Sequence, residues 1–235
     1  SYNVVTGPGA EIGDSLTGHE DVDFVTFTGS SVVGQHTAEI CAKRRTPNTL
    51  EMGGKSPTVI LADADLDQVV PIAARSIFMF AGQACIGSSR FYVERPIYDE
   101  FVKRFSFVAS KVGMGDLRDP NTVIAPIISD RQRQRVKDHI ADAVAKGATV
   151  AAGGEWDGNR CQPTLLTGVT EEMTVCKAET FGPVTSIYPI DSYEEALEMA
   201  NDTAYGLAAA IFTKDINKAM HFVQNSGAGM CHING

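Results

Sequence analysis

The sequence predicts an α/β fold with a largely parallel sheet and helices on both faces. Two observations predict this class. Segments of strand character alternate with segments of helical character along the 235 residues, and some strand segments are almost entirely apolar. Parallel strands need a crossover connection, usually a helix, and strands buried on both faces lose the polar alternation of exposed strands. The alternation therefore favours a sheet that is covered on both sides.

In the first half, strands are predicted where apolar or β-branched residues are bounded by turn residues. Helices are predicted where apolar side chains recur at helical spacing, or where cations gather at the C-terminal end. The predicted extended segments are 22–27, 49–51, 57–61 and 90–94. The predicted helices are 31–43, 67–80 and 98–110. Pro96 precedes the last helix, where a first helical turn tolerates proline.

The second half repeats the alternation. Gly147 predicts the end of one helix, and Ser192 with Glu195 forms a capping box that predicts the start of another. The predicted helices are 130–146, 192–201 and 215–225. The predicted strands are 149–152, 184–190, 208–212 and 229–233.

The composition is that of a globular protein, with 43% hydrophobic and 21% charged residues. The net charge of −9 argues against a nucleic-acid partner, and the single basic run, Lys43-Arg44-Arg45, is more typical of a helix end. No apolar run approaches the roughly 20 residues of a membrane span, and the first residues show no signal-peptide pattern. We therefore expect no nucleic-acid partner, no membrane association and a cytoplasmic location.

The five cysteines are scattered without a Cys-x-x-Cys pair, which indicates a reducing compartment rather than a disulfide framework. The five histidines show no metal-ligand spacing, so we expect no metal site.

Cys85 is the strongest candidate for catalysis. It lies between a predicted helix and a predicted strand, in the small-residue loop Gly82-Gln83-Ala84-Cys85-Ile86-Gly87-Ser88-Ser89. Small neighbours leave room for a substrate and for backbone N–H groups that stabilise an oxyanion. The alternative is a buried structural cysteine, the common state of a lone cysteine. The cysteines that lack such a loop are predicted to be structural, and they are Cys41, Cys161, Cys176 and Cys231.

Two glycine-containing turns precede helical segments. Gly7, Gly9 and Gly13 form the pattern G-x-G-x-x-x-G, which is one residue longer than the common dinucleotide fingerprint G-x-G-x-x-G. An ordinary turn is therefore favoured at this position. Gly29 and Ser30, followed by Gly34, lie between a strand and a helix, where backbone N–H groups can hold a phosphate. The alternative for Ser30 is a plain helix N-cap.

Two carboxylates are further candidates. Glu51 ends an extended segment beside a glycine pair, and catalytic groups of open α/β sheets lie at such ends; otherwise it is solvated or caps a helix. Glu179 lies close to Phe181 in Glu179-Thr180-Phe181-Gly182-Pro183. A carboxylate beside an aromatic ring can hold a ribose and shield a flat cofactor ring, and the alternative is a turn before the next strand.

Six motifs, in order over essentially the whole chain, resemble those of the aldehyde dehydrogenase superfamily. They are Phe27-Thr28-Gly29-Ser30, Leu50-Glu51-Met52-Gly53-Gly54-Lys55-Ser56-Pro57, Gly82-Gln83-Ala84-Cys85, Glu179-Thr180-Phe181-Gly182-Pro183, Tyr205-Gly206-Leu207-Ala208 and Phe212-Thr213-Lys214-Asp215. One such motif is weak evidence, whereas six in the family's order make the resemblance specific.

The resemblance implies a role for each candidate residue. Cys85 matches the family's nucleophile, and Glu51 matches its general base. Six residues match the family's cofactor site. Gly29 and Ser30 match the residues that bind the diphosphate, Gly34 allows the helix to pack closely, and Leu50 precedes the general base. Glu179 matches the residue that binds the nicotinamide ribose, and Phe181 matches the one that lines the nicotinamide pocket.

The implied reaction oxidises an aldehyde, as a small-molecule substrate, to a carboxylic acid with NAD or NADP. The Cys85 thiolate adds to the aldehyde, hydride leaves to the cofactor, and water activated by Glu51 hydrolyses the resulting thioester. One alternative is a CoA-acylating relative, against which Glu51 argues. Another is a non-catalytic fragment or interaction module with the same fold.

The resemblance also implies a chain truncated at both ends. We expect residues 1–52 to be the end of a Rossmann-like NAD(P)-binding domain, and residues 53–235 to be most of the catalytic domain. The family's adenosine-ribose lysine and oxyanion-hole asparagine would precede Ser1, so we expect the chain alone to be inactive. We expect the full-length protein to be a homo-oligomer. Before the Cys85 loop, Phe78-Met79-Phe80 is expected to pack in the core rather than to line a substrate entrance.

Overall fold

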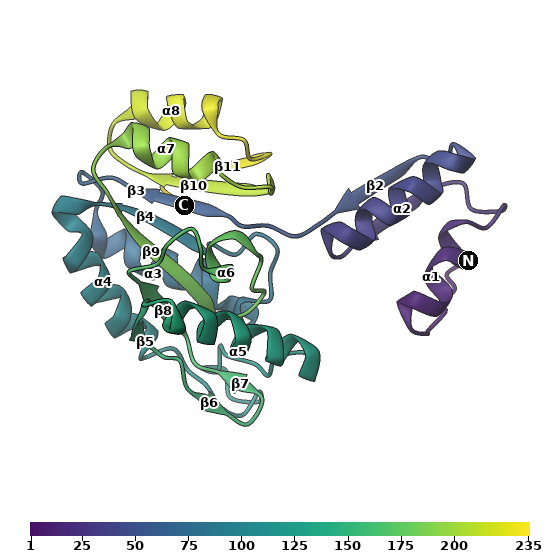
Figure 1. The fold of residues 1–235 in the computed structure, drawn as a ribbon, viewed down its shortest axis with the longest axis horizontal. Helices are drawn as coiled ribbons and strands as arrows, with labels where there is room; N and C mark the ends of the chain where they lie inside the picture. The colour runs from purple at the N-terminus through teal and green to yellow at the C-terminus, as the bar shows by residue number, and fades with distance from the viewer. The chain divides into compact units, whose positions relative to one another are not determined.

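The computed structural model describes all residues from Ser1 to Gly235. The chain forms two compact units, Ser1–Gly53 and Gly54–Gly235, whose elements are drawn in Figure 1. The smaller unit contains two helices and two strands, and the larger unit contains all remaining elements.

The unit Ser1–Gly53 is built around one strand–helix–strand crossover. It consists of α1 (Gly9–Thr17), β1 (Val25–Thr28), α2 (Ser31–Arg44) and β2 (Asn48–Glu51). The two strands pair in parallel, from Val25 opposite Asn48 to Thr28 opposite Glu51. Parallel pairing places the carboxyl ends of both strands at one edge, and the chain enters α2 from that edge.

The helix α2 forms where the sequence supplies both of its ends. The Ser30 side chain accepts a hydrogen bond from the backbone N–H of Val33 at 3.5 Å, which satisfies one free donor of the first turn. Lys43 and Arg44 lie in the last turn, where cations interact favourably with the helix dipole. Its buried residues recur at helical spacing and are Gly34, Thr37 and Cys41.

The unit Gly54–Gly235 is built on a seven-stranded sheet with the order β11-β10-β3-β4-β9-β8-β5. Its strands are β3 (Pro57–Ile60), β4 (Arg90–Glu94), β5 (Thr149–Ala152), β8 (Thr164–Thr167), β9 (Val184–Ile190), β10 (Ala208–Phe212) and β11 (Met230–Ile233). All neighbours pair in parallel except the edge strand β5, which is antiparallel to β8. Between β5 and β8 the chain forms only a small hairpin of β6 (Trp156–Asp157) and β7 (Arg160–Cys161), and no crossover helix.

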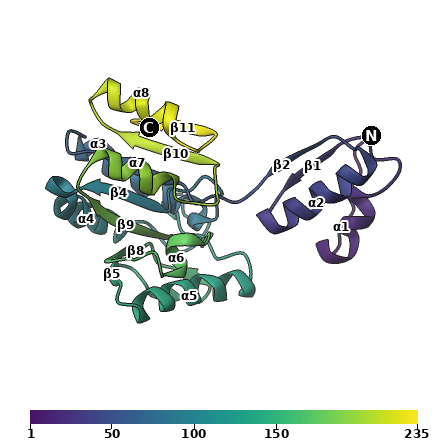
Figure 2. The same ribbon diagram turned by 45° about the horizontal axis from the view of Figure 1, so that its top comes forward.

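Helices cover both faces of this sheet, as Figures 1 and 2 show. One face carries α3 (Leu66–Phe78) and α4 (Arg95–Ala109) around a cluster that includes Phe91 and Phe105. The other face carries α5 (Asp130–Ala145), α6 (Thr174–Lys177), α7 (Tyr193–Asn201) and α8 (Ile216–Asn225). There Tyr92 stacks on Tyr188 with ring centroids 5.0 Å apart. Successive residues of β4 thus enter opposite cores, and the predicted fold class is confirmed.

Several predicted strands have the predicted bounds, namely 90–94, 149–152, 184–190 and 208–212. Two predicted starts are wrong by three residues, because β1 begins at Val25 rather than at 22 and α4 begins at Arg95 rather than at 98. The structure also contains elements that were not predicted, and these are β6, β7, β8 and α6. The strand β8 is the most consequential omission because three of its four residues are fully buried within the sheet. Its sequence, Thr164-Leu165-Leu166-Thr167, shows neither a strict alternation nor a continuous apolar run of four residues, so it carries no strand signal.

The predicted helix 67–80 is wrong at its C-terminal end. The helix α3 stops at Phe78, and Met79–Gly82 forms a short 3₁₀ turn in which Phe80 and Ala81 have φ of 55° and 54°. A left-handed backbone cannot continue an α-helix. The expectation that Phe80 packs in the core is also wrong, because this residue is 66% exposed, whereas Phe78 is 1% exposed.

The predicted capping box at α7 is present in a shifted form. The Ser192 hydroxyl accepts a hydrogen bond from the Glu195 N–H at 3.1 Å, as expected. The Glu195 carboxylate, however, accepts from the N–H of Asp191 at 2.6 Å rather than from that of Ser192. The two side chains therefore satisfy backbone donors on both sides of the helix start.

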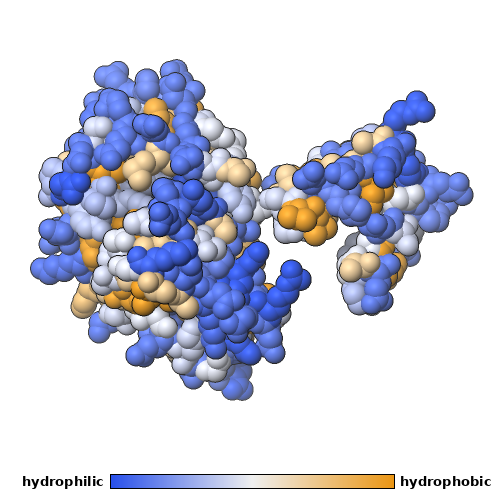
Figure 3. All heavy atoms as spheres, in the orientation of Figure 1, coloured by the Kyte–Doolittle hydropathy of each residue, from blue (hydrophilic) through white to orange (hydrophobic).

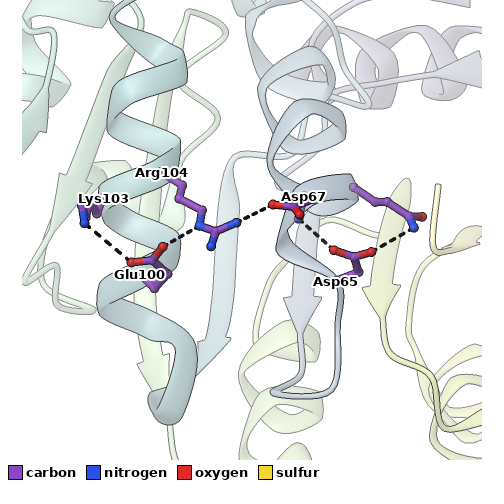
Figure 4. A network of polar contacts seen from close by, with 6 residues as sticks. Asp65, Asp67, Glu100, Lys103 and Arg104 are labelled. Atoms are coloured by element: carbon purple, nitrogen blue, oxygen red, sulfur yellow. Dashed lines mark hydrogen bonds and ion pairs between the residues drawn. The ribbon is translucent and has the colours of Figure 1, made fainter.

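Exposed ion pairs link α3 to α4 (Figure 4). Arg104 of α4 lies 2.6 Å from Glu100 in its own helix and 2.6 Å from Asp67 of α3. Exposed pairs of this kind contribute little to stability. The face drawn in Figure 3 is mainly hydrophilic with scattered hydrophobic residues, as expected around a closed core. None of the helices combines the length and the apolar character that crossing a membrane requires.

Candidate active site

Cys85 lies in the turn between α3 and β4. After Phe78 the left-handed residues of the 3₁₀ turn reverse the chain, and the Gly87 N–H donates to the Ala84 carbonyl at 3.1 Å to close a tight turn around Cys85. The Cys85 side chain is half-buried. The neighbouring Gln83 holds the loop in place, because its side chain accepts a hydrogen bond from the Ile128 N–H at 2.8 Å.

Two glycines bring other segments against this loop. Gly82 has φ of 67°, and a Cβ added there would overlap the carbonyl oxygen of Gly182. A Cβ added to Gly54 would overlap the carbonyl oxygen of Cys85. The segment before β3 and the segment before β9 therefore both touch the Cys85 loop through backbone atoms, and only glycine permits such close approach.

Glu179 is joined to the same place by a long-range hydrogen bond. Its Oε1 accepts from the Gly54 N–H at 3.1 Å, across 125 residues of sequence. The Tyr205 hydroxyl accepts from the Glu179 N–H at 3.4 Å. Burial raises the pKa of Glu179, and the Gly54 hydrogen bond together with the charges of Arg135 and Lys55 opposes that rise. The second carboxylate oxygen makes no hydrogen bond within the chain and stays available to a ligand.

Phe181 occupies an unusual backbone conformation that other residues maintain. Its φ is 53°, which is uncommon for a bulky side chain. The Gln132 side chain donates to the carbonyl oxygens of Thr180 and Phe181, at 2.7 Å and 2.9 Å. His139 Nδ1 lies 3.0 Å from the Thr180 hydroxyl. The helix α5 thus fixes the loop between Glu179 and Phe181.

Sequence reasoning missed Gln132, His139 and Gln83 as residues that position the candidate site. The two α5 residues fall on the buried stripe of that helix, four residues before Val136 and three residues after it. A polar side chain at a position where the helical spacing predicts an apolar one indicates a buried hydrogen bond, and both α5 residues show this signal. Gln83 offers no comparable signal, because its partner lies in an irregular segment.

The candidate residues of the smaller unit meet at the carboxyl ends of its two strands. The Gly29 N–H donates to the Glu51 carbonyl at 3.0 Å, so the two segments lie side by side. Ser30 caps α2 and both Gly29 and Ser30 are exposed, as is Glu51. Gly34 is buried, and a Cβ added there would clash with the Met52 sulfur 2.5 Å away. Leu50 is half-buried on β2.

The remaining cysteines differ in burial. The three buried ones are Cys41, Cys161 and Cys176, which agrees with a structural role. Burial raises the pKa of the Cys161 thiol to about 11 and also raises the pKa of Cys176, so neither thiol forms a thiolate readily near neutral pH. The prediction of burial is wrong for Cys231, which is half-buried because it lies on the edge strand β11. No group of three or more His, Cys, Asp or Glu side chains is arranged to hold a metal ion.

The chain belongs to the aldehyde dehydrogenase family. The sequence profile described as "Aldehyde dehydrogenase family" matches residues 1–235, which confirms the resemblance inferred from the motifs. Aldehyde dehydrogenase 1A1 of Gallus gallus is 43% identical to this chain over 99% of its length. "Aldehyde dehydrogenase, cytosolic 1" of Rattus norvegicus is 41% identical over the same share.

Solved structures agree with this assignment. Betaine aldehyde dehydrogenase of Staphylococcus aureus, in complex with NAD+, matches 98% of this chain with a TM-score of 0.93 and 35% identity. The NAD+ complex of aldehyde dehydrogenase from Bacillus cereus matches 97% with a TM-score of 0.93 and 40% identity. The chain spans about half the length of these relatives, 46% and 47% of the two sequences and 47% of each of the two structures.

Proposed function

We propose that the protein to which this chain belongs oxidises an aldehyde to a carboxylic acid with NAD or NADP, and that Cys85 is the nucleophile. The observation that carries the proposal is the Cys85 loop. A half-buried thiol is held in a tight turn of small residues, and Gly54 joins that turn to the segment of Glu179. Family membership supports the reaction class.

In the proposed mechanism the Cys85 thiolate forms a C–S bond with the aldehyde carbonyl carbon. Backbone N–H groups near the turn stabilise the oxyanion that results. NAD or NADP, when bound, supplies the acceptor for the hydride that leaves this carbon. Glu51 then takes a proton from water, the water oxygen adds to the thioester carbon, and the C–S bond breaks to release the acid and the Cys85 thiolate.

The N-terminus of α2 fits the diphosphate of a dinucleotide. Gly29 and Ser30 are exposed there, and the first turn of α2 contains no acidic residue. The free N–H groups and the positive end of the helix dipole are therefore open to an anion. We infer that Gly34 allows α2 to pack closely on Met52. We also infer that Leu50 contributes an apolar surface to the same cofactor site.

Glu179 and Phe181 fit the nicotinamide half of the cofactor. Glu179 has one carboxylate oxygen bonded to Gly54 and one available, so it can accept hydrogen bonds from ribose hydroxyls. The half-buried Phe181 ring, held by Gln132, offers an apolar surface to a flat ring. The two NAD+ complexes of relatives support NAD as the cofactor.

We further infer that Ser1–Gly53 is the end of the cofactor-binding domain and that Gly54–Gly235 is most of the catalytic domain. The parallel β1–α2–β2 crossover supports the first assignment, because such units bind dinucleotides in many α/β proteins. We also propose a homo-oligomer, on the family resemblance alone, and a cytoplasmic location. The name of the rat relative, which includes "cytosolic", supports that location.

The test is a rapid-mixing experiment on the full-length protein with the substitutions Glu51→Gln and Cys85→Ser. Glu51→Gln should retain a burst of about one equivalent of NADH and then turn over about 100-fold to 10,000-fold more slowly, because it loses general-base catalysis but keeps the nucleophile. Cys85→Ser should show no burst, because an unactivated hydroxyl is a poor nucleophile at neutral pH.

Cys231→Ser is the matched control, since it changes the other half-buried thiol. It should leave both the burst and the steady rate unchanged. Full turnover in Cys85→Ser would reject the nucleophile assignment. Full steady-state turnover in Glu51→Gln would make Glu51 a structural residue.

A further inference from the structure

Lys55 is a buried cation that the proposed mechanism does not use. Only 2% of its surface is exposed, and its Nζ has no hydrogen-bond partner. No carboxylate oxygen lies within 4.0 Å of its Nζ, and Lys55 takes part in none of the ion pairs of the structure. Lysine is almost never fully buried without a partner, and an unpaired buried charge is strongly unfavourable.

The nearest groups do not supply the missing negative charge. Arg90 is also 2% exposed, and its donors bind neutral oxygens, including the carbonyls of Lys55 at 2.8 Å and Ala200 at 3.0 Å and the Tyr92 hydroxyl at 2.9 Å. Two buried cations therefore lie close together without a buried carboxylate between them.

Three other titratable groups face Lys55 from the elements packed around it. Burial raises the pKa of Cys176 on α6, so that thiol stays neutral. Burial lowers the pKa of His139 on α5 to about 4, so that imidazole stays neutral at neutral pH. Glu179 is the one carboxylate among these groups. It makes no ion pair with Lys55, and its charge raises the pKa of Lys55 by less than burial and the charge of Arg90 lower it. The two buried cations, Lys55 and Arg90, therefore outnumber the one carboxylate near them, and that carboxylate forms an ion pair with neither.

Lys55 lines a small cavity between the C-terminal end of α7 and the segment before β11. The cavity has a volume of about 20 Å³. This volume suits one water molecule or one monatomic ion. Its walls are mostly small or polar residues, among them Ala200, Thr203, Gly206, Ser226 and Gly227.

We propose that this cavity binds a small inorganic anion of halide size, with the Lys55 ammonium as its cationic ligand. A water molecule would accept a hydrogen bond from Nζ but would leave the charge unpaired, whereas an anion satisfies both requirements. The small walls exclude larger organic anions such as gluconate.

Anion binding at this site is linked to protonation. Burial and the charge of Arg90 lower the pKa of Lys55 to about 7, so the amine loses its charge just above neutral pH when no anion is bound. Only the charged form attracts an anion. The apparent affinity should therefore fall about tenfold for each pH unit above 7.

The site lies one residue from Gly54, whose N–H holds Glu179, and the Lys55 charge lowers the pKa of that carboxylate. A bound anion offsets that charge, so anion binding at Lys55 is coupled to the ionisation of Glu179. This connection to cofactor binding rests on the proposed function, whereas the anion site does not.

The test combines diffraction and solution measurements on the full chain with bromide as the probe. Crystals grown in sodium bromide at pH 6 should show an anomalous peak beside Lys55 Nζ. In solution, sodium bromide should raise the melting temperature at constant ionic strength set with sodium gluconate, because it binds only the folded state. The apparent bromide affinity should fall about tenfold per pH unit between pH 7 and 9.

Lys55→Met should abolish both the anomalous peak and the specific bromide effect. Lys103→Met, which changes a lysine whose side chain is 81% exposed, should keep both. If Lys55→Met does not fold, the diffraction experiment and the pH series on the unsubstituted chain still decide the question. A water molecule in place of bromide, an equal bromide effect in Lys55→Met, or no dependence on pH would each overturn the proposal.

Discussion

At the scale of single residues, His139 links a buried hydrogen bond to the pH dependence of stability. The residue is 7% exposed and lies 3.0 Å from the Thr180 hydroxyl. Burial lowers its pKa from 6.5 to about 4. Between these two pH values the unfolded chain takes up a proton at this position and the folded chain does not. The contribution of His139 to stability is therefore fully present above pH 6.5 and is lost as the pH falls towards 4.

His139→Gln removes this titration and keeps a side chain that can bond to Thr180. We expect the unsubstituted chain to lose more stability between pH 7 and pH 4.5 than His139→Gln does, as measured by urea unfolding at each pH. His19→Gln changes an imidazole whose side chain is 58% exposed and should leave the dependence on pH unchanged. An identical loss of stability in His139→Gln and the unsubstituted chain would contradict this account.

At the scale of elements, the 3₁₀ turn after α3 determines where the Cys85 loop lies. Gly82 combines φ of 67° with backbone contact to Gly182. Gly158 has a similar φ of 58°, in the turn between β6 and β7, but a Cβ there would meet nothing within 4 Å. Substitution of Gly158 therefore tests the strain of the left-handed backbone alone, whereas substitution of Gly82 tests that strain together with the backbone contact to Gly182.

Gly158→Ala should lower the free energy of unfolding by about 1 kcal/mol, the strain of a left-handed alanine. Gly82→Ala should lower it by clearly more, because the added Cβ also forces the Gly182 segment away. Urea unfolding of both variants measures the difference. Equal losses would show that the two loops can separate without cost, and the close contact would then not position Cys85.

At the scale of the whole molecule, stability of the larger unit depends on a sheet that is covered on both faces. Ile60 of β3 is 0% exposed, and its neighbour Val59, also 0% exposed, belongs to the core on the opposite face. Both residues are adjacent in one strand, so their side chains point to opposite sides. Each core thus reaches the middle of the sheet.

Ile60→Ala should lower the free energy of unfolding by about 2–5 kcal/mol, because it leaves a cavity in a core that cannot fully collapse. Ile128→Ala makes the same chemical change at a residue that is 80% exposed, and should change stability by less than about 0.5 kcal/mol. Chemical denaturation of both variants provides the comparison. A small loss in Ile60→Ala would mean that the core around β3 is loosely packed.

Much of the fold was predictable because its signals are local. Strands such as 90–94 and 184–190 are marked by apolar runs, and α7 and the C-terminal turn of α5 are marked by capping residues. The strand β8 has neither a strict alternation nor a continuous apolar run, and α6 has only four residues, so neither element carries such a signal. The end of α3 was mispredicted because the apolar spacing continues to Phe80, whereas the left-handed turn is a response to contacts with another segment.

By itself, the sequence determined the α/β class, the family and the position of Cys85 in a small-residue loop, because periodicity and motifs are properties of neighbouring residues. Only the tertiary structure decided the strand order, the antiparallel edge of β5 and the contact between Gly54 and Glu179, which lie 125 positions apart. It also decided that Lys55, one polar residue within a family motif, is fully buried beside Arg90. The burial of a side chain depends on which distant segments pack around it. Neighbouring residues in the sequence therefore do not determine it.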